Sequence, residues 1–519
     1  MFPQELVYDD ILLIGHNRTL QDSPSLPNIF SQHLWEGTPQ NDDTNGSYYR
    51  PLVIASFYLD ILLFGNNYTN FHIQSLFWHL LCCSLLWFWV SPFINSKSAK
   101  VLAVCTFAFH PIQMEIVAFL AARNDAMACA GVLSMLLALR HNKHFLAGLS
   151  LFFALLCKES ALLIPFVWVM LSWKEHRETF ISSLCSLGIP IFLYFCMRIG
   201  AGISWPHSEG IYPMHIVISI LIYAYHIVFP SLLLPSSHVL WPSTAELWGG
   251  GCAVFSIIWL FRHPIASKNW GRALCIAGII PSFAAITKTG LVSDRYLYIP
   301  MVGICVLFAN YISNLSPSQE KPEKKILYIG IPLIFLYLLQ DMRILPAWND
   351  NITLFSTAAT VHTSPYQSGA LAKAYEEVGA FDDAAFWYEQ AVQSPHPYEH
   401  SCYNITWIHL LRGDFERIII IGEEALVAGC PGTEELTAPL ALAHTFAGNW
   451  DRASALTNQS TRDPRNIFFL VRVIQAAHNR EIHAFSNPAY REAAEDALRI
   501  LENSDPESAQ WLTQYLSMK

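Results

Sequence analysis

Residues 72–94 read HIQSLFWHLLCCSLLWFWVSPFI and contain no Lys, Arg, Asp or Glu. An α-helix rises about 1.5 Å per residue, so a helix of this length exceeds the hydrocarbon core of a bilayer, which is roughly 30 Å thick. The stretch is therefore predicted to be a transmembrane helix, and the rest of the chain is interpreted outward from it.

Apolar stretches of similar character follow it. The hydrophobic pattern predicts further spans at residues 98–120, 124–140, 144–157, 158–173, 179–199, 214–235, 247–262, 271–290, 296–314 and 325–342. Ahead of them, Pro51–Gly65 is apolar but too short to cross a bilayer, so an interfacial helix is expected there. With 53% hydrophobic and only 14% charged residues, the composition is that of a polytopic membrane protein.

Basic residues in short loops indicate the cytoplasmic side of a membrane protein. They gather in several predicted connections: Lys97 with Lys100, Arg140 with Lys143, Lys174 with Arg177, Arg262 with Lys268 and Arg272, and Lys321 with Lys324 and Lys325. This orientation places residues 1–70 and the region after Asp341 on the exoplasmic side. The basic loops of the first and second halves of the membrane region indicate orientations that differ by one membrane crossing. An irregular segment is therefore expected between them, at residues 200–246.

The polar region after residue 343 contains a repeat. When Pro365 is position 1 of a 34-residue unit, small and aromatic residues fall where tetratricopeptide repeats need them: Leu371, Ala372, Tyr375, Gly379, Ala384, Tyr388 and Ala391. Gly413 follows Gly379 by 34 residues (413 − 379), and Gly448 follows Gly413 by 35 (448 − 413). Three helix pairs are predicted, near residues 365–398, 399–432 and 434–467. Such pairs stack into a concave surface that binds peptides, and an ordinary helical domain is the alternative.

The composition argues against several classes of function. The net charge is −10 and the pI is near 6.0, and no Lys/Arg cluster has interleaved aromatic residues, so nucleic-acid binding is not expected. The twelve cysteines lie mostly in apolar stretches without metal-ligand spacing, and they are interpreted as small hydrophobic residues. His72 and His79 have no carboxylate or Cys partners in the pattern, so core histidines are predicted and no metal site is expected.

Two adjacent carboxylates stand ahead of the membrane region, in the stretch Val7-Tyr8-Asp9-Asp10. Carboxylates are costly near hydrocarbon, so a pair at a membrane mouth is expected to have a function. A solvated or helix-capping acidic dipeptide in a loop is the alternative. No apolar span precedes Val7, so no segment before it is expected to carry the pair across the membrane.

The motifs together resemble one family. They are VYDD at 7–10, SYYRPL at 47–52, FAFHPIQMEIVAFLAARND at 107–125, CKESALLIPF at 157–166, SDRYLYIPMVG at 293–303 and the stretch from Trp348 to Phe355. The set is similar to the transmembrane and tetratricopeptide-repeat O-mannosyltransferases and their bacterial relatives, and it covers nearly the whole chain. Two features depart from the family: its members usually have a transmembrane helix directly before VYDD, and its animal members have longer repeat arrays.

The resemblance implies an all-α fold, in which a polytopic transmembrane helical domain of the GT-C type precedes a tetratricopeptide-repeat α-solenoid. Members of this class take a sugar from a polyprenyl- or dolichyl-phosphate donor on the exoplasmic face and pass it to a protein hydroxyl. The lipid-linked sugar phosphate is the donor substrate, and no cofactor is implied.

Roles for individual residues follow from the resemblance. Asp9 is the candidate base that takes the proton of the acceptor hydroxyl, and Asp10 assists it or binds the acceptor. The leaving phosphate requires cations on the exoplasmic side. The candidates for that role are Arg295 first, then Arg123 and Lys158, and also Arg50. Arginine at a membrane interface also anchors helices, which is the alternative interpretation.

Supporting roles are expected for His110, Glu115, Glu159 and Tyr296. Glu115 lies within an apolar span, where a carboxylate needs a partner. Arg123 or Lys158 is the expected partner, and a structural ion pair between helices is the alternative to a catalytic role.

Three regions are expected: an exoplasmic loop with the acidic motif and an interfacial helix at 1–71, a multi-span glycosyltransferase-like domain at 72–342 and a repeat domain at 343–519. The predicted function is transfer of mannose or a related hexose to Ser or Thr of an exported protein, which the repeats present. A non-enzymatic membrane-anchored scaffold and a lipid-A or wall-polymer sugar transferase are the alternatives. The predicted location is a bacterial inner membrane with a periplasmic repeat domain, with the endoplasmic reticulum membrane as the alternative.

Overall fold

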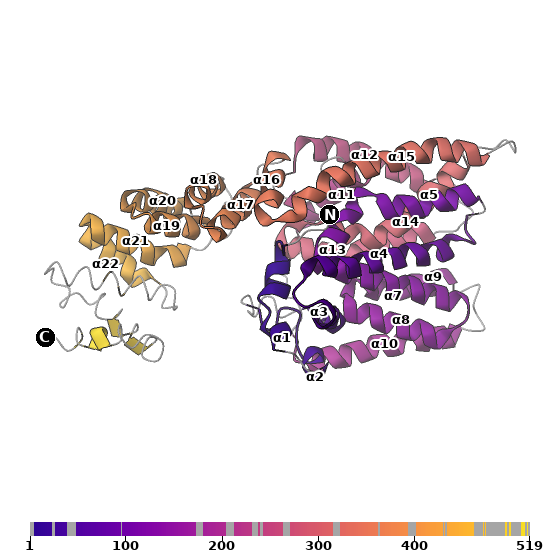
Figure 1. Cartoon of the computed structure of the whole chain (residues 1–519), viewed down its shortest axis with the longest axis horizontal. Helices are drawn as coiled ribbons and strands as arrows, with labels where there is room; N and C mark the ends of the chain where they lie inside the picture. Colours follow the sequence, from indigo (N-terminus) through magenta and orange to yellow (C-terminus); the bar gives the residue numbers. More distant parts are fainter. Residues whose placement is uncertain are drawn as a thin grey trace. The chain divides into compact units, whose positions relative to one another are not determined.

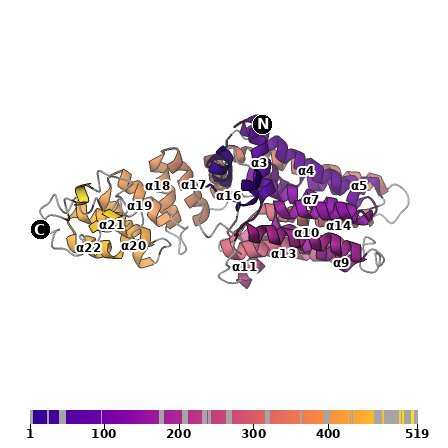
Figure 2. The same cartoon turned by 90° about the horizontal axis from the view of Figure 1, so that it is seen from below.

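The computed structural model describes residues 5–22, 26–38, 48–94, 96–172, 180–203, 212–230, 237–238, 242–262, 270–314, 322–361, 364–392, 401–428, 430 and 433–460, with scattered positions beyond 460. Some predictions lie wholly or partly outside these residues. They are those for Ser47, Lys174, Arg177, Lys268 and Lys321, for much of the irregular segment at 200–246, and for the repeat ends at 393–400 and 461–467. The chain divides into two compact units, Met1–Leu354 and Phe355–Lys519, which Figures 1 and 2 show from two sides. The predicted all-α class is confirmed in both.

The first unit contains the membrane helices. They are α4 (Tyr68–Val90), α5 (Lys97–Phe109), α7 (Arg123–Arg140), α8 (His144–Cys157), α9 (Ile164–Ser172), α10 (Phe180–Gly200), α11 (Pro213–Val228), α12 (Thr244–Arg262), α13 (Trp270–Thr289), α14 (Tyr298–Asn314) and α15 (Pro322–Ile344). Figure 1 shows α4, α5, α7, α8 and α14 running side by side, and α7 packs on both α4 and α8.

Seven helical segments among the described residues are long and apolar enough to cross a membrane, or eight if one bent pair is a single span. The chain is therefore a multi-pass membrane protein. Each predicted span contains at least one helix, but α8, α9 and α11 are shorter than the segments that meet this standard.

The predicted span at 98–120 is broken. Pro111 has no backbone N–H and cannot continue the helix before it, so α5 ends and the short helices η2 (Pro111–Gln113) and α6 (Met114–Ala118) follow at an angle of 46°. The His110 ring caps the new turn, because its Nδ1 accepts the N–H of Ile112 at 3.3 Å. The helix η3 (Leu120–Ala122) then leads into α7.

Two further breaks lie in the same unit. After α8, Lys158 is extended (φ −161°) and η4 (Glu159–Leu163) follows before α9. After α13, β2 (Leu291–Val292) pairs with β1 (Ser237–His238), and η6 (Asp294–Leu297) leads into α14. Interrupted helices expose backbone and polar side chains that continuous spans would not, and these breaks carry the polar residues of the candidate site.

The N-terminal segment packs against the membrane helices. It contains η1 (Ile11–Gly15), α1 (Arg18–Gln21), α2 (Leu26–Phe30) and α3 (Pro51–Phe64). Leu13, Ile14 and Leu20 are buried in one core with Val53 and Phe57 of α3. The short apolar stretch at 51–65 is thus a helix, as expected.

The described part of the second unit contains three helix pairs. After α16 (Asn351–Val361) come α17 (Pro365–Glu377) with α18 (Phe381–Val392), α19 (Ser401–Leu411) with α20 (Phe415–Ala428), and α21 (Thr433–Ala447) with α22 (Trp450–Gln459). Gly379, Gly413 and Gly448 have φ values of 77°, 70° and 82°. Each lies between the two helices of a pair, where a positive φ favours glycine, so the repeated glycines mark the turns. Ala384 and Tyr388 are fully buried.

A disulfide joins two cysteines of the second unit, Cys402 of α19 and Cys430 after α20. The interpretation of the cysteines as unpaired hydrophobic residues is wrong for these two. The other ten cysteines are free thiols.

Candidate functional site

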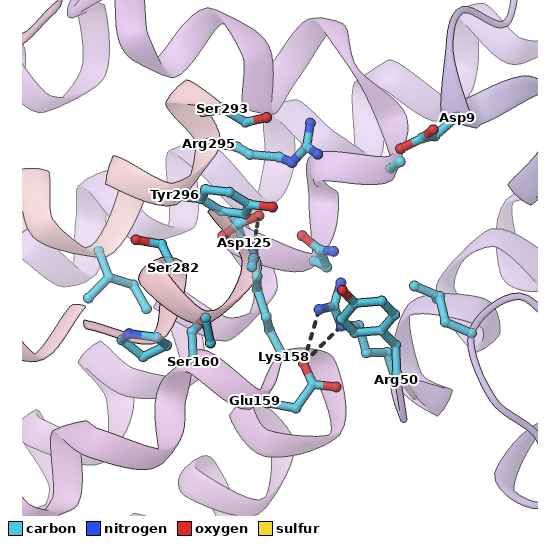
Figure 3. A pocket seen from close by; sticks show the side chains of 18 of the residues that line it. Asp9, Arg50, Asp125, Lys158, Glu159, Ser160, Ser282, Ser293, Arg295 and Tyr296 are labelled. Carbon is cyan, nitrogen blue, oxygen red and sulfur yellow. Dashed lines mark hydrogen bonds and ion pairs between the residues drawn. The ribbon is translucent and has the colours of Figure 1, made fainter. Parts of the chain in front are cut away.

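A cavity of about 480 Å³ lies in the first unit where the helix breaks meet. Its walls come from the N-terminal segment (Tyr8, Asp9, Trp35, Tyr48, Arg50), the start of α7 (Asn124, Asp125), the break after α8 (Lys158, Glu159, Leu162), the end of α10 (Tyr194, Phe195, Arg198), and α13 with η6 (Pro281, Ala285, Arg295, Tyr296). Figure 3 shows the charged side chains around it, with Asp9 and Arg295 toward one end and Arg50 and Glu159 toward the other.

The two carboxylates of the VYDD motif have different surroundings. Asp9 lines the cavity. Asp10 is 1% exposed and accepts hydrogen bonds from the backbone N–H groups of Leu120 and Ala121, at 3.0 and 2.6 Å. Tyr8 before them has φ 53°, and its N–H donates to Oδ1 of Asn351 at 2.8 Å. The motif is therefore fixed at both sides of Asp9, whose side chain faces the cavity.

The environment of both carboxylates favours the protonated form. Desolvation raises the pKa of Asp9, and the Arg295 guanidinium partly offsets that rise. Burial raises the pKa of Asp10 to about 8, against the opposing effect of its two backbone donors. A carboxylate whose pKa is raised is a stronger base once ionised, which suits Asp9 for accepting a proton.

Arg295 lines the cavity and is held by Glu115. Its Nη1 lies 2.7 Å from Oε1 of Glu115, and its backbone N–H donates to Oε2 at 2.9 Å. The prediction that Glu115 pairs with Arg123 or Lys158 is therefore wrong. The guanidinium of Arg295 also lies over the rings of Phe119 and Tyr296, at 5.2 and 5.5 Å, so Tyr296 belongs to the same wall.

Lys158 and Arg50 also line the cavity, and each forms an ion pair with a carboxylate. The Nζ of Lys158 lies 2.6 Å from both carboxylate oxygens of Asp125. Arg50 binds Oε2 of Glu159 through Nε and Nη2, each at 3.0 Å, and the backbone N–H of Tyr49 donates to Oε1 at 3.2 Å.

The structure does not bring Arg123 to the cavity. Its side chain is fully buried between helices, where Nη1 lies 2.6 Å from Oδ2 of Asp60 and Nε donates to Oγ of Ser75 at 3.1 Å. Nη2 donates to the carbonyl of Phe71 at 2.9 Å. Arg123 therefore ties α7 to α3 and α4 through an ion pair with Asp60, which was not predicted.

His110 does not line the cavity either. Its Nε2 lies 3.1 Å from the carbonyl oxygen of Ile227, and its ring contacts Tyr337. His72 and His79 contact the backbone of Val117 and Ala108, as predicted for core histidines. Among the residues that the structure describes, no three His, Cys, Asp or Glu side chains form a metal-binding group.

Two charged residues of the cavity, Asp125 and Arg198, were not predicted. Asp125 ends the RND sequence that begins at Arg123, and that motif was the signal that could have found it. Arg198 lies near the end of an apolar helix, and an arginine in such a helix is itself a sign of function. The cavity thus carries Arg50, Lys158, Arg198 and Arg295 together with three carboxylates.

Comparison with known proteins identifies relatives of the chain. It is 22% identical over 426 residues to "Protein O-mannosyl-transferase F38B6.6" of Caenorhabditis elegans, which covers 76% of this chain and 60% of that protein. It is 31% identical over 165 residues to Protein O-mannosyl-transferase Tmtc1 of Drosophila melanogaster (30% and 19% covered). It is 30% identical over 141 residues to Protein O-mannosyl-transferase TMTC1 of Homo sapiens (27% and 16%).

The aligned region spans at most 60% of the length of these three relatives. No family model and no solved structure matches the chain. The relatives nevertheless all carry the name protein O-mannosyl-transferase, and the alignment to the Caenorhabditis elegans protein covers 76% of this chain. The chain is thus similar to the TMTC-type protein O-mannosyl-transferases, the family that its motifs resemble.

Proposed function

We propose that the protein is a membrane glycosyltransferase that passes mannose from a polyprenyl- or dolichyl-phosphate to a Ser or Thr hydroxyl of an exported protein. The observation that carries this proposal is the cavity that Asp9 lines together with Arg295, Lys158 and Arg50 (Figure 3). The names of the homologues support the sugar and the type of acceptor.

The chemistry is a displacement with inversion at the anomeric carbon. The acceptor oxygen forms a bond to that carbon while the bond from the carbon to the phosphate oxygen breaks, and its electron pair leaves with the lipid phosphate. Asp9 accepts the proton of the acceptor hydroxyl. Cations in the cavity stabilise the charge that develops on the leaving phosphate, and Arg295, Lys158 and Arg50 are the predicted residues that line it.

The second unit is proposed to bind the acceptor. Its helix pairs follow the spacing of tetratricopeptide repeats, which form concave surfaces for peptides. The disulfide between Cys402 and Cys430 supports an oxidising compartment for this unit, because such bonds persist outside the cytosol. That supports the exoplasmic placement and suits either a bacterial periplasm or the endoplasmic reticulum.

The test is sugar transfer by the purified full chain in lipid nanodiscs. Radiolabelled mannose on polyprenyl phosphate is the donor, an extract of secreted proteins is the acceptor, and release of label by β-elimination identifies Ser/Thr linkage. We expect label in protein with the mannose donor and none with polyprenyl phosphate plus free mannose. No transfer from mannose, glucose or other lipid-linked donors would contradict the proposal and would favour the scaffold.

A further inference from the structure

Two arginines lie beside one carboxylate in the cavity. Nη1 of Arg198 is 4.0 Å from Oε1 of Glu159, and Arg198 is 2% exposed. Arg50 binds the other oxygen of Glu159 at 3.0 Å. Together the three side chains carry a net positive charge, and all three line the cavity, where a low dielectric constant strengthens the attraction of an anion. An anion bound between the two guanidinium groups would balance that charge.

Apolar side chains enter the cavity from the same elements. Phe195 precedes Arg198 by three residues on α10, so the two lie on one face of the helix. Leu162 follows Glu159 by three residues in η4, and α13 adds Pro281 and Ala285 to the wall. Charged and apolar side chains therefore line adjacent parts of the cavity. This arrangement suits a ligand in which an anionic group is joined to a hydrocarbon chain.

Inversion determines which end of the cavity takes the phosphate. In such a displacement the base and the leaving oxygen lie on opposite sides of the anomeric carbon. Asp9 lies toward the end that holds Arg295, whereas Arg50 and Glu159 lie toward the other end (Figure 3). Arg295 is moreover held by both oxygens of Glu115. Of the cations that line the cavity, Arg50 is therefore placed closer to the leaving phosphate than Arg295.

We propose that Arg198 and Arg50 bind the phosphate of the polyprenyl donor, and that its first isoprene units lie along Phe195, Leu162 and the Pro281–Ala285 face of α13. This inference rests on the proposed function, because it places the donor within that same cavity. Guanidinium groups suit the role, since each can donate two hydrogen bonds to phosphate oxygens. Arg198 is thereby added to the donor site.

The first test is binding of polyprenyl phosphate without sugar to the purified full chain in detergent. Wild type is compared with Arg198→Ala, Arg198→Lys and Arg343→Ala, which changes an exposed arginine of α15 outside the cavity. We expect at least tenfold weaker binding for Arg198→Ala, a smaller loss for Arg198→Lys and no change for Arg343→Ala. Equal binding by wild type and Arg198→Ala would overturn the inference and leave the proposed function standing. No binding by wild type would remove the proposed function itself.

The second test needs no variant. This is useful because Arg198 is buried beside Glu159, and replacing it can disturb the fold as well as binding. A polyprenyl phosphate with a diazirine on its first isoprene unit is photolysed on the wild-type protein, and the labelled peptides are mapped by mass spectrometry. Label on α10 near Phe195 and on α13 near Pro281 is expected. Label confined to the N-terminal segment near Asp9 would overturn the assignment.

Discussion

At the scale of single residues, Asp9 and Asp10 show what a sequence can and cannot reveal. The pair was predicted to have a function because carboxylates are costly near a membrane. The sequence alone, however, does not distinguish the surroundings of two adjacent carboxylates. Their difference comes from the backbone of Leu120 and Ala121, more than a hundred residues later, whose N–H groups bind Asp10 and leave Asp9 facing the cavity. Long-range contacts of this kind cannot be predicted from local pattern.

Removing the Asp10 carboxylate should loosen the junction between the N-terminal segment and the start of α7. Asp10→Ala leaves two buried N–H groups without an acceptor, which costs about 1–3 kcal/mol for each group. Hydrogen exchange at the amides of Leu120 and Ala121 should become faster. Asp10→Asn keeps one of the two acceptor oxygens, so only one of the two amides should exchange faster in that variant. Unchanged exchange in Asp10→Ala would show that these contacts do not hold the segment.

The rate of transfer should depend on pH through Asp9. Its pKa is raised above the ordinary value of 3.8 by desolvation, and only the ionised form can accept a proton. The rate therefore rises with pH as Asp9 ionises, and the acid limb of kcat/KM lies above 3.8. Asp9→Glu should shift that limb without abolishing it. If the limb stays in place in Asp9→Glu, another group is responsible.

Lys158 and Asp125 should behave as one buried pair. Their side chains are 8% and 5% exposed, so removing one partner leaves an uncompensated charge, which costs about 3–5 kcal/mol. Lys158→Met should therefore lower the melting temperature strongly. Replacing both, as in Lys158→Met with Asp125→Leu, should recover much of the loss. Additive losses in the double variant would mean that the two residues do not interact.

At the scale of elements, helix positions were predicted better than helix ends. The hydrophobic pattern located the helices of the membrane region, because burial in hydrocarbon imposes apolar length. It joined α5, η2 and α6 into one span, although Pro111 stands between them. The charged residues at such breaks find partners from other elements, as Arg295 does with Glu115, and sequence order does not show which.

The disulfide should stabilise the second unit. Cys402 and Cys430 are 28 residues apart in sequence, and closing a loop of that length in the unfolded chain corresponds to about 3–4 kcal/mol in the chain-entropy estimate. Cys402→Ser should lower the temperature at which this unit unfolds, as followed by calorimetry of the full chain. Cys185→Ser, which changes an exposed free thiol, is the control. Equal transitions in both variants would mean that the bond contributes nothing.

At the scale of the whole molecule, the chain combines a multi-pass membrane unit with a unit of helix pairs. Composition and periodicity predicted both parts, since apolar length and repeated glycine turns are properties of sequence. The cavity, by contrast, is assembled from segments that lie far apart in the chain. Asp125 and Arg198 were missed for that reason, and Arg123 was included because its motif does not show that it points into the core.

The most direct measurement is mannose transfer from polyprenyl phosphate in membranes that carry wild type, Asp9→Asn or Asp10→Asn at matched expression. We expect Asp9→Asn to slow transfer by about 10²–10⁴-fold, the usual loss when a general base is removed. Asp10→Asn should keep a rate within about tenfold of wild type, because the amide oxygen still accepts one of the two backbone N–H groups that hold the motif in place. Transfer at the wild-type rate by Asp9→Asn would contradict the claim that this carboxylate and its cavity carry out the reaction.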